Sequence, residues 1–451
     1  MIFKRKIYSK LLDWKNTYSS NYALLIEGAR RIGKSTIVEE FAKHEYKSYI
    51  LINFQEASEE VISLWNDISD LDFIFLRIQS IYHVNLTEKE SLIIFDEVQY
   101  CPKARQAIKA LVKDGRYNYI ETGSLISIKR NVSNILIPSE EMRINMYPMD
   151  FLEFLEAIDH SNTIQLLEYY ISNNKSMTDN ENRELMKLFR LYMLIGGMPQ
   201  AVSAYIEKNN FAYVEKVKRT IIDLYDREFY KLDNSGKLSK LFNNIPSNLE
   251  HNKNRYNINR ILEKQLSESS KQKLFSYLID SKTVLPSFHV AKPGSGLTQT
   301  KELDKYKLFL VDSGLFCTLM FYDRNDNEEV YNDLYQKLFS DKLSANLGYL
   351  YENVVATQIA SNGYNLYYHT FPNDTGHRNY EIDFLINMHS KTYPIEVKSS
   401  KWKTHPSLDA FSKKYSERIG KRIILHTKKL YKDEDIYCLP VYFAGMLDRL
   451  K

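Results

Sequence analysis

The sequence predicts an α/β protein of several domains: a doubly wound parallel sheet with a helical lid, a central winged-helix-like segment and a C-terminal α/β domain. Three observations predict this organisation. Apolar runs alternate with helical patterns over residues 1–150, as in a parallel sheet covered on both faces. Helical patterns fill residues 151–231, and strand patterns return near the end of the chain. At 451 residues, the chain is also too long for one hydrophobic core.

The first predicted domain, residues 1–150, contains short apolar runs that we expect to be strands. These runs lie at residues 23–27, 48–54, 91–97 and 117–123. Helical patterns separate them, and parallel strands need such crossover connections. The alternation therefore predicts a mainly parallel sheet.

A glycine-bounded loop follows the first run and reads GARRIGKST. It has the spacing G-x-x-x-x-G-K-[ST], with the required strand before it and helix after it. We expect its backbone N–H groups to bind phosphate, Lys34 to reach the β- and γ-phosphates and Ser35 to hold Mg²⁺. The predicted nucleotide-binding residues of this loop are Gly28, Ala29, Arg30, Arg31, Ile32, Gly33, Lys34, Ser35 and Thr36. The alternative is an ordinary glycine turn with a solvated lysine.

The third run, LIIFDE, ends in two carboxylates, Asp96 and Glu97. Ligands bind at the carboxyl ends of the strands in open α/β sheets. We therefore predict that Asp96 contributes to the Mg²⁺ shell and that Glu97 polarises the attacking water. Alone, such a pair is more often a charge at a helix N-terminus. After a complete phosphate loop, the catalytic interpretation is favoured.

The fourth run ends in ETGS, which makes Thr122 and Ser124 candidate contacts to the γ-phosphate or the attacking water. An arginine that reaches the phosphate of a neighbouring subunit is harder to assign. The candidates are Arg30, Arg31, Arg130 and Arg143. The sequence does not choose between them, so a homo-oligomer is left open.

Residues 151–231 are predicted to form a helical lid or connector, and residues 232–345 a winged-helix-like domain and linker. Three short helical patterns precede a strand-like run and a glycine-rich turn, as in a winged helix. Residues 251–282 hold seven Lys or Arg and three acidic residues. The last helix would read a DNA groove with Ser270, Lys271, Gln272 and Lys273. Docking of a protein partner is the alternative.

The last predicted domain, residues 346–451, places Asp383 on one strand and Glu396 and Lys398 on the next. Alternate residues of a strand share a face, so Glu396 and Lys398 point the same way. Two carboxylates would bind Mg²⁺ or Mn²⁺ and activate a water, with Lys398 stabilising the developing charge. Glu352, on a helical pattern, is a further candidate ligand. This set predicts a nuclease-type site, and a surface ion pair is the alternative.

The overall net charge of +4 is too small to indicate a nucleic-acid partner, but its distribution is uneven. Residues 398–432 hold eleven Lys or Arg and two acidic residues. Trp402, His405 and Tyr415 lie in or beside this stretch. It suits contacts to a phosphate backbone. A solvated helix face is the alternative.

Composition excludes several classes of protein. With 44% hydrophobic residues, 15 Gly and 11 Pro, the chain is neither disordered nor collagen-like. Its three cysteines are far apart, which argues against a disulfide framework or a zinc cluster. No apolar segment is long enough to cross a membrane. We therefore expect a cytoplasmic protein.

The motifs resemble those of a widespread prokaryotic group of predicted AAA-type P-loop ATPases, whose C-terminal domain is similar to the PD-(D/E)XK nuclease fold. The resemblance covers nearly the whole chain. It is carried by GARRIGKST, IIFDEVQYCPKARQAIKALVKDGRYNYIETGSLISI, MYPMDFLEFL, GGMPQAV, KLFLVDSGLF, YENVVATQIA and EIDFLI…PIEVKSS. The resemblance implies that the nucleotide is ATP. The phosphate loop alone would not identify the base, because it contacts only the phosphates.

Two functions of different classes follow, both with ATP and Mg²⁺ as cofactors. The first is an ATPase acting on nucleic acid, DNA in preference to RNA, with its ATP state coupled to a metal-dependent nuclease domain. The second is an ATP-controlled switch or scaffold that binds DNA or protein without cutting. The predicted catalytic residues are Lys34, Glu97, Asp383, Glu396 and Lys398, and the predicted metal ligands are Ser35, Asp96, Glu352, Asp383 and Glu396.

Overall fold

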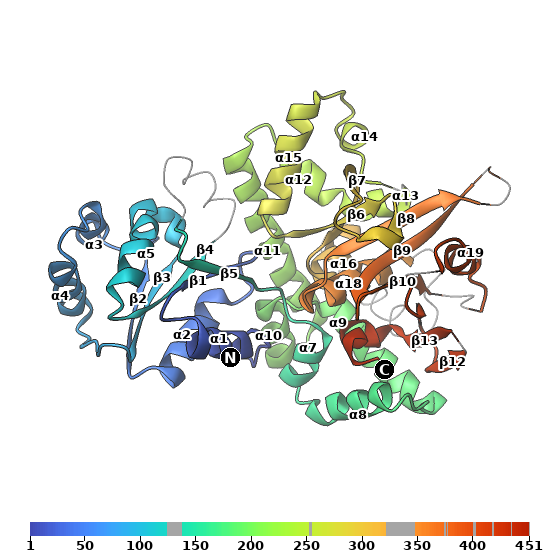
Figure 1. Ribbon diagram of the computed structural model, residues 1–451, viewed down its shortest axis with the longest axis horizontal. Helices are drawn as coiled ribbons and strands as arrows, with labels where there is room; N and C mark the ends of the chain where they lie inside the picture. Colours follow the sequence, from blue (N-terminus) through green and yellow to red (C-terminus); the bar gives the residue numbers. More distant parts are fainter. Residues whose placement is uncertain are drawn as a thin grey trace. The chain divides into compact units, whose positions relative to one another are not determined.

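The chain forms two compact units, drawn in Figure 1. The computed structural model describes residues 1–123, 138–251, 255–321, 348–373, 376, 378–399, 403–416, 419–433 and 435–450. Unit 1 comprises Met1–Tyr147 and Asp280–Lys282, and unit 2 comprises Pro148–Ile279 and Thr283–Lys451.

Unit 1 is built on a five-stranded sheet with the strand order β2-β3-β4-β1-β5. Its strands are β1 (Ala23–Glu27), β2 (Ser48–Asn53), β3 (Ser91–Asp96), β4 (Asn118–Gly123) and β5 (Glu141–Asn145). All pairings in the described part of this sheet are parallel. The predicted parallel sheet is therefore confirmed, with β5 as an additional edge strand beside β1.

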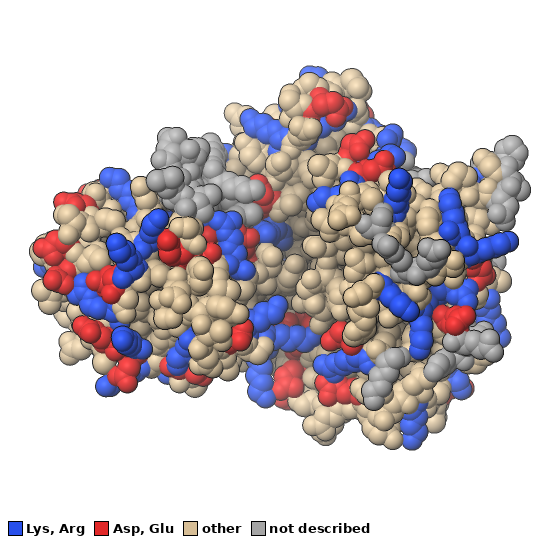
Figure 2. Space-filling view, viewed as in Figure 1, with Lys and Arg blue, Asp and Glu red and all other residues tan. Residues whose placement is uncertain are grey.

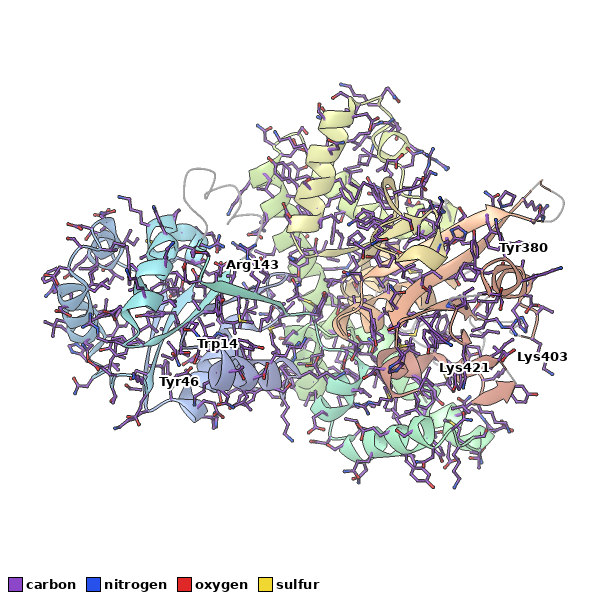
Figure 3. The ribbon with its side chains drawn as sticks, in the orientation of Figure 1. Trp14, Tyr46, Arg143, Tyr380, Lys403 and Lys421 are labelled. Carbon is purple, nitrogen blue, oxygen red and sulfur yellow. The ribbon has the colours of Figure 1, made fainter. Side chains whose placement is uncertain are left out.

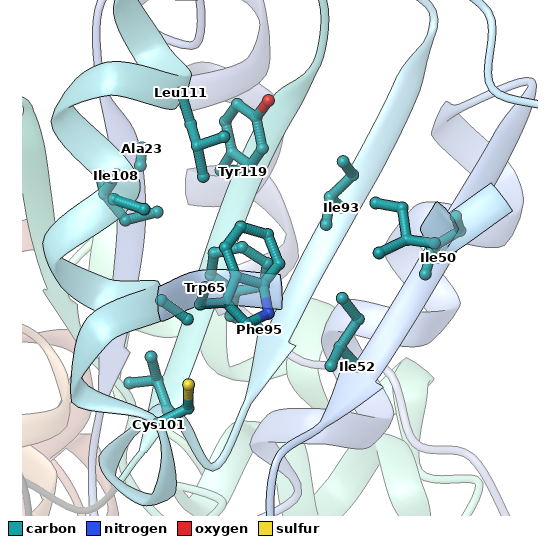
Figure 4. Close-up of a cluster of buried hydrophobic side chains, with 14 of the residues drawn as sticks. Ala23, Ile50, Ile52, Trp65, Ile93, Phe95, Cys101, Ile108, Leu111 and Tyr119 are labelled. Carbon is teal, nitrogen blue, oxygen red and sulfur yellow. The ribbon is translucent and has the colours of Figure 1, made fainter. Parts of the chain in front are cut away.

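Helices cover both faces of this sheet. They are α1 (Ile7–Thr17), α2 (Lys34–Glu45), α3 (Glu59–Ser63), η1 (Leu64–Asn66), α4 (Leu71–Tyr82), η2 (Val98–Tyr100) and α5 (Pro102–Asp114). One buried cluster joins α3, η1, α4 and α5 to β2, β3 and β4, and Figure 4 shows Trp65 against Phe95 within it. The centroids of these two rings lie 4.9 Å apart. Leu24 and Ile94 are buried outside this cluster, on the opposite face. The packing of Phe95 fixes the end of β3, whose last residue is Asp96.

A buried ionic network lies between β4, β5 and α5. Arg105 donates to Glu141 with an Nη2–Oε2 distance of 2.8 Å, and both side chains are almost fully buried. Glu121 lies beside this pair and is completely buried. Burial, and then the charge of Glu141, raise the pKa of the Glu121 carboxyl well above its usual range. Burial therefore favours the neutral, protonated form of this carboxyl in the folded protein.

Replacing Glu121 with glutamine is expected to stabilise unit 1 increasingly as pH rises. Below the unfolded pKa of about 4.3, both states of the wild type hold the proton, so Glu121 carries no pH-dependent cost. Above it the unfolded state loses the proton more readily than the folded state, which favours unfolding. Urea unfolding should show that the advantage of Glu121→Gln grows as the pH rises from 4 to 7. A difference that does not change with pH would contradict this.

Unit 2 contains one mixed eight-stranded sheet with the strand order β12-β13-β11-β10-β9-β8-β6-β7. Its strands are β6 (Val284–Val290), β7 (Lys301–Leu310), β8 (Leu366–Pro372), β9 (Asn379–Met388), β10 (Lys391–Lys398), β11 (Arg422–His426), β12 (Tyr431–Asp433) and β13 (Ile436–Pro440). The predicted wing hairpin is β6 and β7, and β6 also pairs in parallel with β8. Strands on both sides of the predicted boundary at residue 345 therefore share one sheet. The winged-helix and nuclease-like assignments remain predictions.

The helices of unit 2 precede and flank this sheet (Figure 1). They are α7 (Phe151–Ala157), α8 (Ser161–Ser172), α9 (Asp179–Ile195), α10 (Pro199–Lys208), α11 (Phe211–Leu232), α12 (Lys237–Asn243), α13 (Ile245–His251), α14 (Ile258–Leu262), α15 (Glu268–Asp280), α16 (Ser313–Met320), α18 (Gly348–Ser361), α19 (Pro406–Lys414), η3 (Pro293–Ser295) and η6 (Val441–Arg449). Capping boxes start α7, with Asp150 and Glu153, and α9, with Thr178 and Glu181. Residues 151–231, predicted to be helical, form α7 to α11.

The GGMPQAV and KLFLVDSGLF segments meet in a buried junction between α9 and α16. Asp312 accepts the Gly197 N–H at 2.6 Å and the Leu315 N–H at 2.8 Å. From α11, the buried Lys218 ammonium donates to the Leu194 carbonyl at 2.8 Å and the Gly314 carbonyl at 3.3 Å. These bonds satisfy backbone groups at the end of α9 and within α16, so both segments have a structural role.

Candidate functional site

The GARRIGKST loop joins β1 to α2 in unit 1. Gly33 caps α2 with a φ of 91°, a left-handed conformation that favours glycine. A Cβ on Gly28 would lie 2.5 Å from the Met146 carbonyl oxygen. The two glycines are thus required for different reasons, conformation at Gly33 and space at Gly28. The loop turns into the first residue of α2, as the sequence predicts.

Lys34 is buried inside this loop. Its Nζ donates to the Gly28 carbonyl at 3.0 Å and the Ala29 carbonyl at 2.8 Å. The ammonium therefore lies within the curve of the loop, at the N-terminus of a helix of 12 residues. A phosphate entering the loop would meet both the ammonium and the positive end of the helix dipole.

Two predicted residues from two elements converge on one carboxylate oxygen of a third, Asp96. The Ser35 hydroxyl of α2 donates to Asp96 Oδ1 at 2.7 Å, and the Thr122 hydroxyl of β4 donates to the same oxygen. Asp96 ends β3 and is 5% exposed. A hydroxyl and a carboxylate oxygen are hard ligands that Mg²⁺ accepts, so Ser35 and Asp96 fit the predicted ion.

Glu97 lies beside the phosphate loop. Its backbone has a φ of 52°, so the chain turns sharply directly after β3. Its N–H donates to the Thr122 hydroxyl oxygen at 3.4 Å. Its carboxylate accepts a hydrogen bond from the Gln99 amide, and Glu97 Oε2 lies 4.0 Å from Arg30 Nη2. Gln99 is almost fully buried and positions Glu97, a role that the sequence did not indicate.

The predicted arginines have different surroundings. Arg30 contacts Glu97, and Arg31 has a left-handed φ of 66° within the loop. Arg143 lies on β5, as Figure 3 shows, and its Nε is 2.7 Å from Glu141 Oε1. Ser124 and Arg130 lie outside the described residues. The arginine finger therefore remains a prediction without a chosen residue.

Arg5 supports the phosphate loop from the N-terminal segment, and sequence reasoning missed it. Its guanidinium donates to the Ile32 carbonyl at 2.9 Å and to the Tyr147 carbonyl at 2.6 Å. Within the loop, Ala29 and Ile32 are buried, and Thr36 lies in the first turn of α2. The N-terminus carries no motif for this contact, which depends on tertiary structure alone.

In unit 2 the structure brings Asp383, Glu396 and Lys398 together. β9 and β10 pair antiparallel, with Ile395 opposite Phe384, so Glu396 and Asp383 are neighbours across the strands. Asp383 Oδ2 accepts the Val397 N–H at 2.7 Å, and Lys398 Nζ lies 2.5 Å from Glu396 Oε1. The convergence that the sequence predicts for these three residues is present.

Two residues missed by sequence reasoning, Lys307 on β7 and Glu381 on β9, belong to the same cluster. The Lys307 ammonium forms an ion pair with Glu381, and its Nζ lies 3.8 Å from Glu352 Oε2. Glu352, on α18, thus faces a lysine. The cluster contains four carboxylates and two ammonium groups: Glu352, Glu381, Asp383 and Glu396 with Lys307 and Lys398.

Burial dominates the electrostatics of this cluster. It raises the pKa of Asp383 to about 7, against the opposing effect of the Lys307 ammonium. It also raises the pKa of Glu396, and the neighbouring Lys398 ammonium opposes that rise. Burial disfavours the charged form of Lys307, but the neighbouring carboxylates outweigh it and raise the pKa of the ammonium. Asp383 and Glu396 therefore have raised pKa values despite their lysine neighbours, whereas Lys307 is held in its charged form.

Asp383 and Glu396 carry carboxylate oxygens, which are ligands that a hard cation such as Mg²⁺ accepts. Glu396 Oε2 is buried and accepts no hydrogen bond from the described residues. The described ranges contain no group of three or more His, Cys, Asp or Glu side chains placed to share a metal ion. An ammonium faces the predicted ligand Glu352, since Lys307 Nζ lies 3.8 Å from its Oε2, and the role of Glu352 as a ligand stays a prediction.

Basic side chains are numerous around the end of unit 2. Figure 2 shows Lys and Arg outnumbering Asp and Glu over the part of the surface where Figure 1 draws β9, β10 and α19. Lys403 and Lys421 belong to this region (Figure 3). Arg422 Nη1 lies 2.6 Å from Asp409 Oδ1, so not every basic group there is available to a ligand. Lys401, Trp402 and Arg418 lie outside the described residues.

A cavity of about 730 Å³ lies between α14, α15 and β7. Its lining includes Lys271 and Gln272, two of the predicted groove-reading residues. Phe275 and Tyr306 add aromatic rings whose centroids are 4.1 Å apart. Lys271 Nζ is 2.6 Å from the exposed Glu268. Cationic and aromatic groups in one cavity suit stacking on a base and contact with a phosphate.

Over the described part of the chain, no helix combines the length and the apolar character needed to cross a membrane.

Comparison with protein families matches separate parts of the chain. Residues 20–155 match the AAA domain family. Residues 186–326 and 347–443 match two domains of unknown function, DUF8612 and DUF4143. The AAA match contains the phosphate loop, Asp96, Glu97 and Thr122, and it supports a P-loop ATPase domain at the N-terminus.

Two similar proteins share less than a quarter of their residues with this chain over the matched regions. An uncharacterized protein of Haemophilus influenzae is 23% identical over 55% of this chain and 60% of its own length. An uncharacterized protein of Methanocaldococcus jannaschii is 24% identical over 50% of this chain and 51% of its own length. The chain thus spans only about half to three fifths of the relatives that it matches.

Solved structures with similarity include a Walker-type ATPase of Pyrococcus abyssi, at 19% identity and a TM-score of 0.43, covering 71% of this chain and 96% of that one. Cdc6p of Pyrobaculum aerophilum shows 13% identity and a TM-score of 0.23, covering 74% of this chain and 94% of that one.

Proposed function

We propose that unit 1 binds ATP together with Mg²⁺ and hydrolyses it. The observation that carries this proposal is the convergence of Ser35 and Thr122 on Asp96, next to the ammonium of Lys34 in the loop. ATP is proposed as the nucleotide because residues 20–155 match the AAA domain family.

Each residue of the site has a distinct proposed role. Lys34 and the N–H groups at the start of α2 bind the phosphates and neutralise charge in the transition state. Ser35 and Asp96 would hold the ion, which supplies further charge neutralisation on the phosphate oxygens. Thr122 fixes Asp96, and Glu97 orients and polarises the attacking water.

Replacing Glu97 with glutamine is expected to lower the rate of ATP hydrolysis about 100-fold or more and to leave ATP affinity nearly unchanged. The amide keeps the size of the side chain but loses the basic oxygen. Phosphate release measures the rate, and fluorescence titration with a labelled nucleotide measures the affinity. Glu39→Gln on α2 is the control, because Glu39 is 39% exposed. Equal losses of affinity and rate would show that Glu97 binds the nucleotide instead of acting on water.

We further propose that unit 2 acts on nucleic acid, DNA in preference to RNA, and that the ATP state of unit 1 controls a metal-dependent cut at Asp383, Glu396 and Lys398. The convergence of these three residues and the surrounding basic side chains support this proposal. The two carboxylates would hold the ion that activates the attacking water, and Lys398 would stabilise the developing charge.

A second candidate function is an ATP-controlled switch in which unit 2 binds DNA or protein without cutting. One observation favours it. Lys307 and Lys398 form ion pairs with Glu352, Glu381 and Glu396, and the charge of Lys307 also acts on Asp383, so lysine ammonium groups already offset the charge of these carboxylates.

One set of assays separates the two functions. Wild type, Lys34→Ala and Glu396→Ala are compared for ATP hydrolysis, for DNA binding against salt concentration, and for cutting of DNA and RNA with Mg²⁺ or Mn²⁺. The first function requires cutting that Glu396→Ala abolishes while ATP hydrolysis is retained. DNA binding that differs between ADP and ATP, with no cutting by wild type, supports the second. Binding to phosphates predicts affinity that falls as salt rises, with a slope near 0.9 for each phosphate neutralised on duplex DNA.

A further inference from the structure

Lys307 is a buried cation within the acidic cluster of unit 2. Its side chain is 1% exposed and forms an ion pair with Glu381, with Glu352 Oε2 at 3.8 Å. The ammonium also lies 5.3 Å from the ring centroid of Tyr368. A buried ammonium is unfavourable unless it is paired, so the position of Lys307 depends on these carboxylates.

Lys307 and a divalent ion would compete for the same oxygen atoms. A metal ion binds carboxylate oxygens at about 2.0 to 2.6 Å. An ion at Glu352 or Glu381 would therefore lie close to the Lys307 ammonium, and the two positive charges would repel each other strongly. Glu352 and Glu381 both have the ammonium of Lys307 nearby. Glu396 differs in one oxygen: Lys398 Nζ lies 2.5 Å from its Oε1, but its Oε2 is buried and no described residue donates to it.

We propose that Lys307 is an internal cation that takes the place of a divalent metal ion at Glu352 and Glu381, and that it leaves Asp383 and Glu396 as the carboxylates available to a metal. This inference rests on the metal site proposed for unit 2, but not on whether that site cuts.

A two-carboxylate site has a consequence for ligand binding. Mg²⁺ is usually held by one or two carboxylates together with phosphate oxygens of a substrate. An ion at Asp383 and Glu396 would keep several water ligands, and a nucleic-acid phosphate could replace one of them. By linkage, the ion and the nucleic acid each increase the affinity of the protein for the other.

Manganese titration tests the role of Lys307. Wild type and Lys307→Met are titrated with Mn²⁺ by calorimetry without nucleotide, so any weak binding at unit 1 is common to both proteins. Methionine keeps the apolar stem and removes the charge. We expect Lys307→Met to gain one Mn²⁺ site per chain relative to wild type. Adding Glu352→Gln and Glu381→Gln to Lys307→Met should abolish the gain.

The control is Lys305→Met, two residues earlier on β7, where the side chain is 44% exposed and pairs with Glu302. It should bind Mn²⁺ as wild type does.

A folded Lys307→Met protein that gains no Mn²⁺ site would overturn the inference, whatever its nuclease activity. If Lys307→Met does not fold, Glu352→Gln in the wild-type background replaces it. This variant should bind Mn²⁺ as wild type does, and weaker binding would equally overturn the inference. If Lys307→Met gains a Mn²⁺ site but the wild-type protein does not cut nucleic acid, only the proposed nuclease function is refuted.

Discussion

Replacing Lys34 with alanine is expected to reduce ATP hydrolysis by a factor of about 100 to 1000, the usual loss when one preorganised group that stabilises transition-state charge is removed. Lys34 is buried, and its ammonium lies between loop carbonyls at 2.8 and 3.0 Å. Water that filled the space left by alanine would not restore the positive charge. Phosphate release under saturating ATP measures the effect, and nucleotide titration measures the loss of binding that accompanies it.

Lys43→Ala is the matched control for Lys34→Ala. Lys43 lies on the same helix, is 44% exposed and forms ion pairs with the neighbouring Glu39 and Glu40. Its removal should leave hydrolysis within about twofold of wild type, since exposed ion pairs contribute little. Hydrolysis by Lys34→Ala at a rate similar to that of Lys43→Ala would refute the proposed site. Circular dichroism of both variants checks that the fold is retained.

The sequence predicted the elements around the phosphate loop well, because local patterns determine them. The loop, the start of α2 and the end of β3 are each adjacent to a strand or helix whose apolar pattern is clear. Gln99 and Arg5 were missed because their roles come from tertiary contacts with Glu97 and the Ile32 carbonyl. β5 was missed because its sequence, EMRIN, alternates weakly and contains two charges.

The cluster in unit 2 was predicted only in part. Alternation along β10 placed Glu396 and Lys398 on one face, and pairing with β9 placed Asp383 beside them. Lys307 was missed because it lies on β7, in a hairpin that local patterns assign to a different domain. Pairing of β6 with β8 joins that hairpin to the same sheet. Such long-range pairing has no local signal in the amino-acid sequence.

Replacing Gly197 with alanine is expected to destabilise unit 2 by about 3 kcal/mol or more, a loss at the upper end of overpacking effects. A Cβ at this position would lie 1.9 Å from the Met149 carbonyl oxygen and 2.6 Å from the Met149 nitrogen. Both are backbone atoms, and the Met149 N–H donates to the Gly197 carbonyl at 2.8 Å. Tyr192 also donates to the Met149 carbonyl at 2.8 Å. Relief of the clash would therefore break several buried hydrogen bonds at once.

Gly314→Ala provides an independent test of the same junction, because its Cβ would lie 2.3 Å from the Ile195 carbonyl oxygen. Gly348→Ala is the control, since a Cβ there meets no described atom within 4 Å. Urea unfolding followed by circular dichroism should show a large loss of stability for Gly197→Ala and Gly314→Ala and little change for Gly348→Ala. If both junction variants unfold at the wild-type urea concentration, the GGMPQAV and KLFLVDSGLF segments do not act as the structural junction described above. ATP hydrolysis by the same variants, assayed below their unfolding transition, then tells whether these segments matter to the nucleotide site instead.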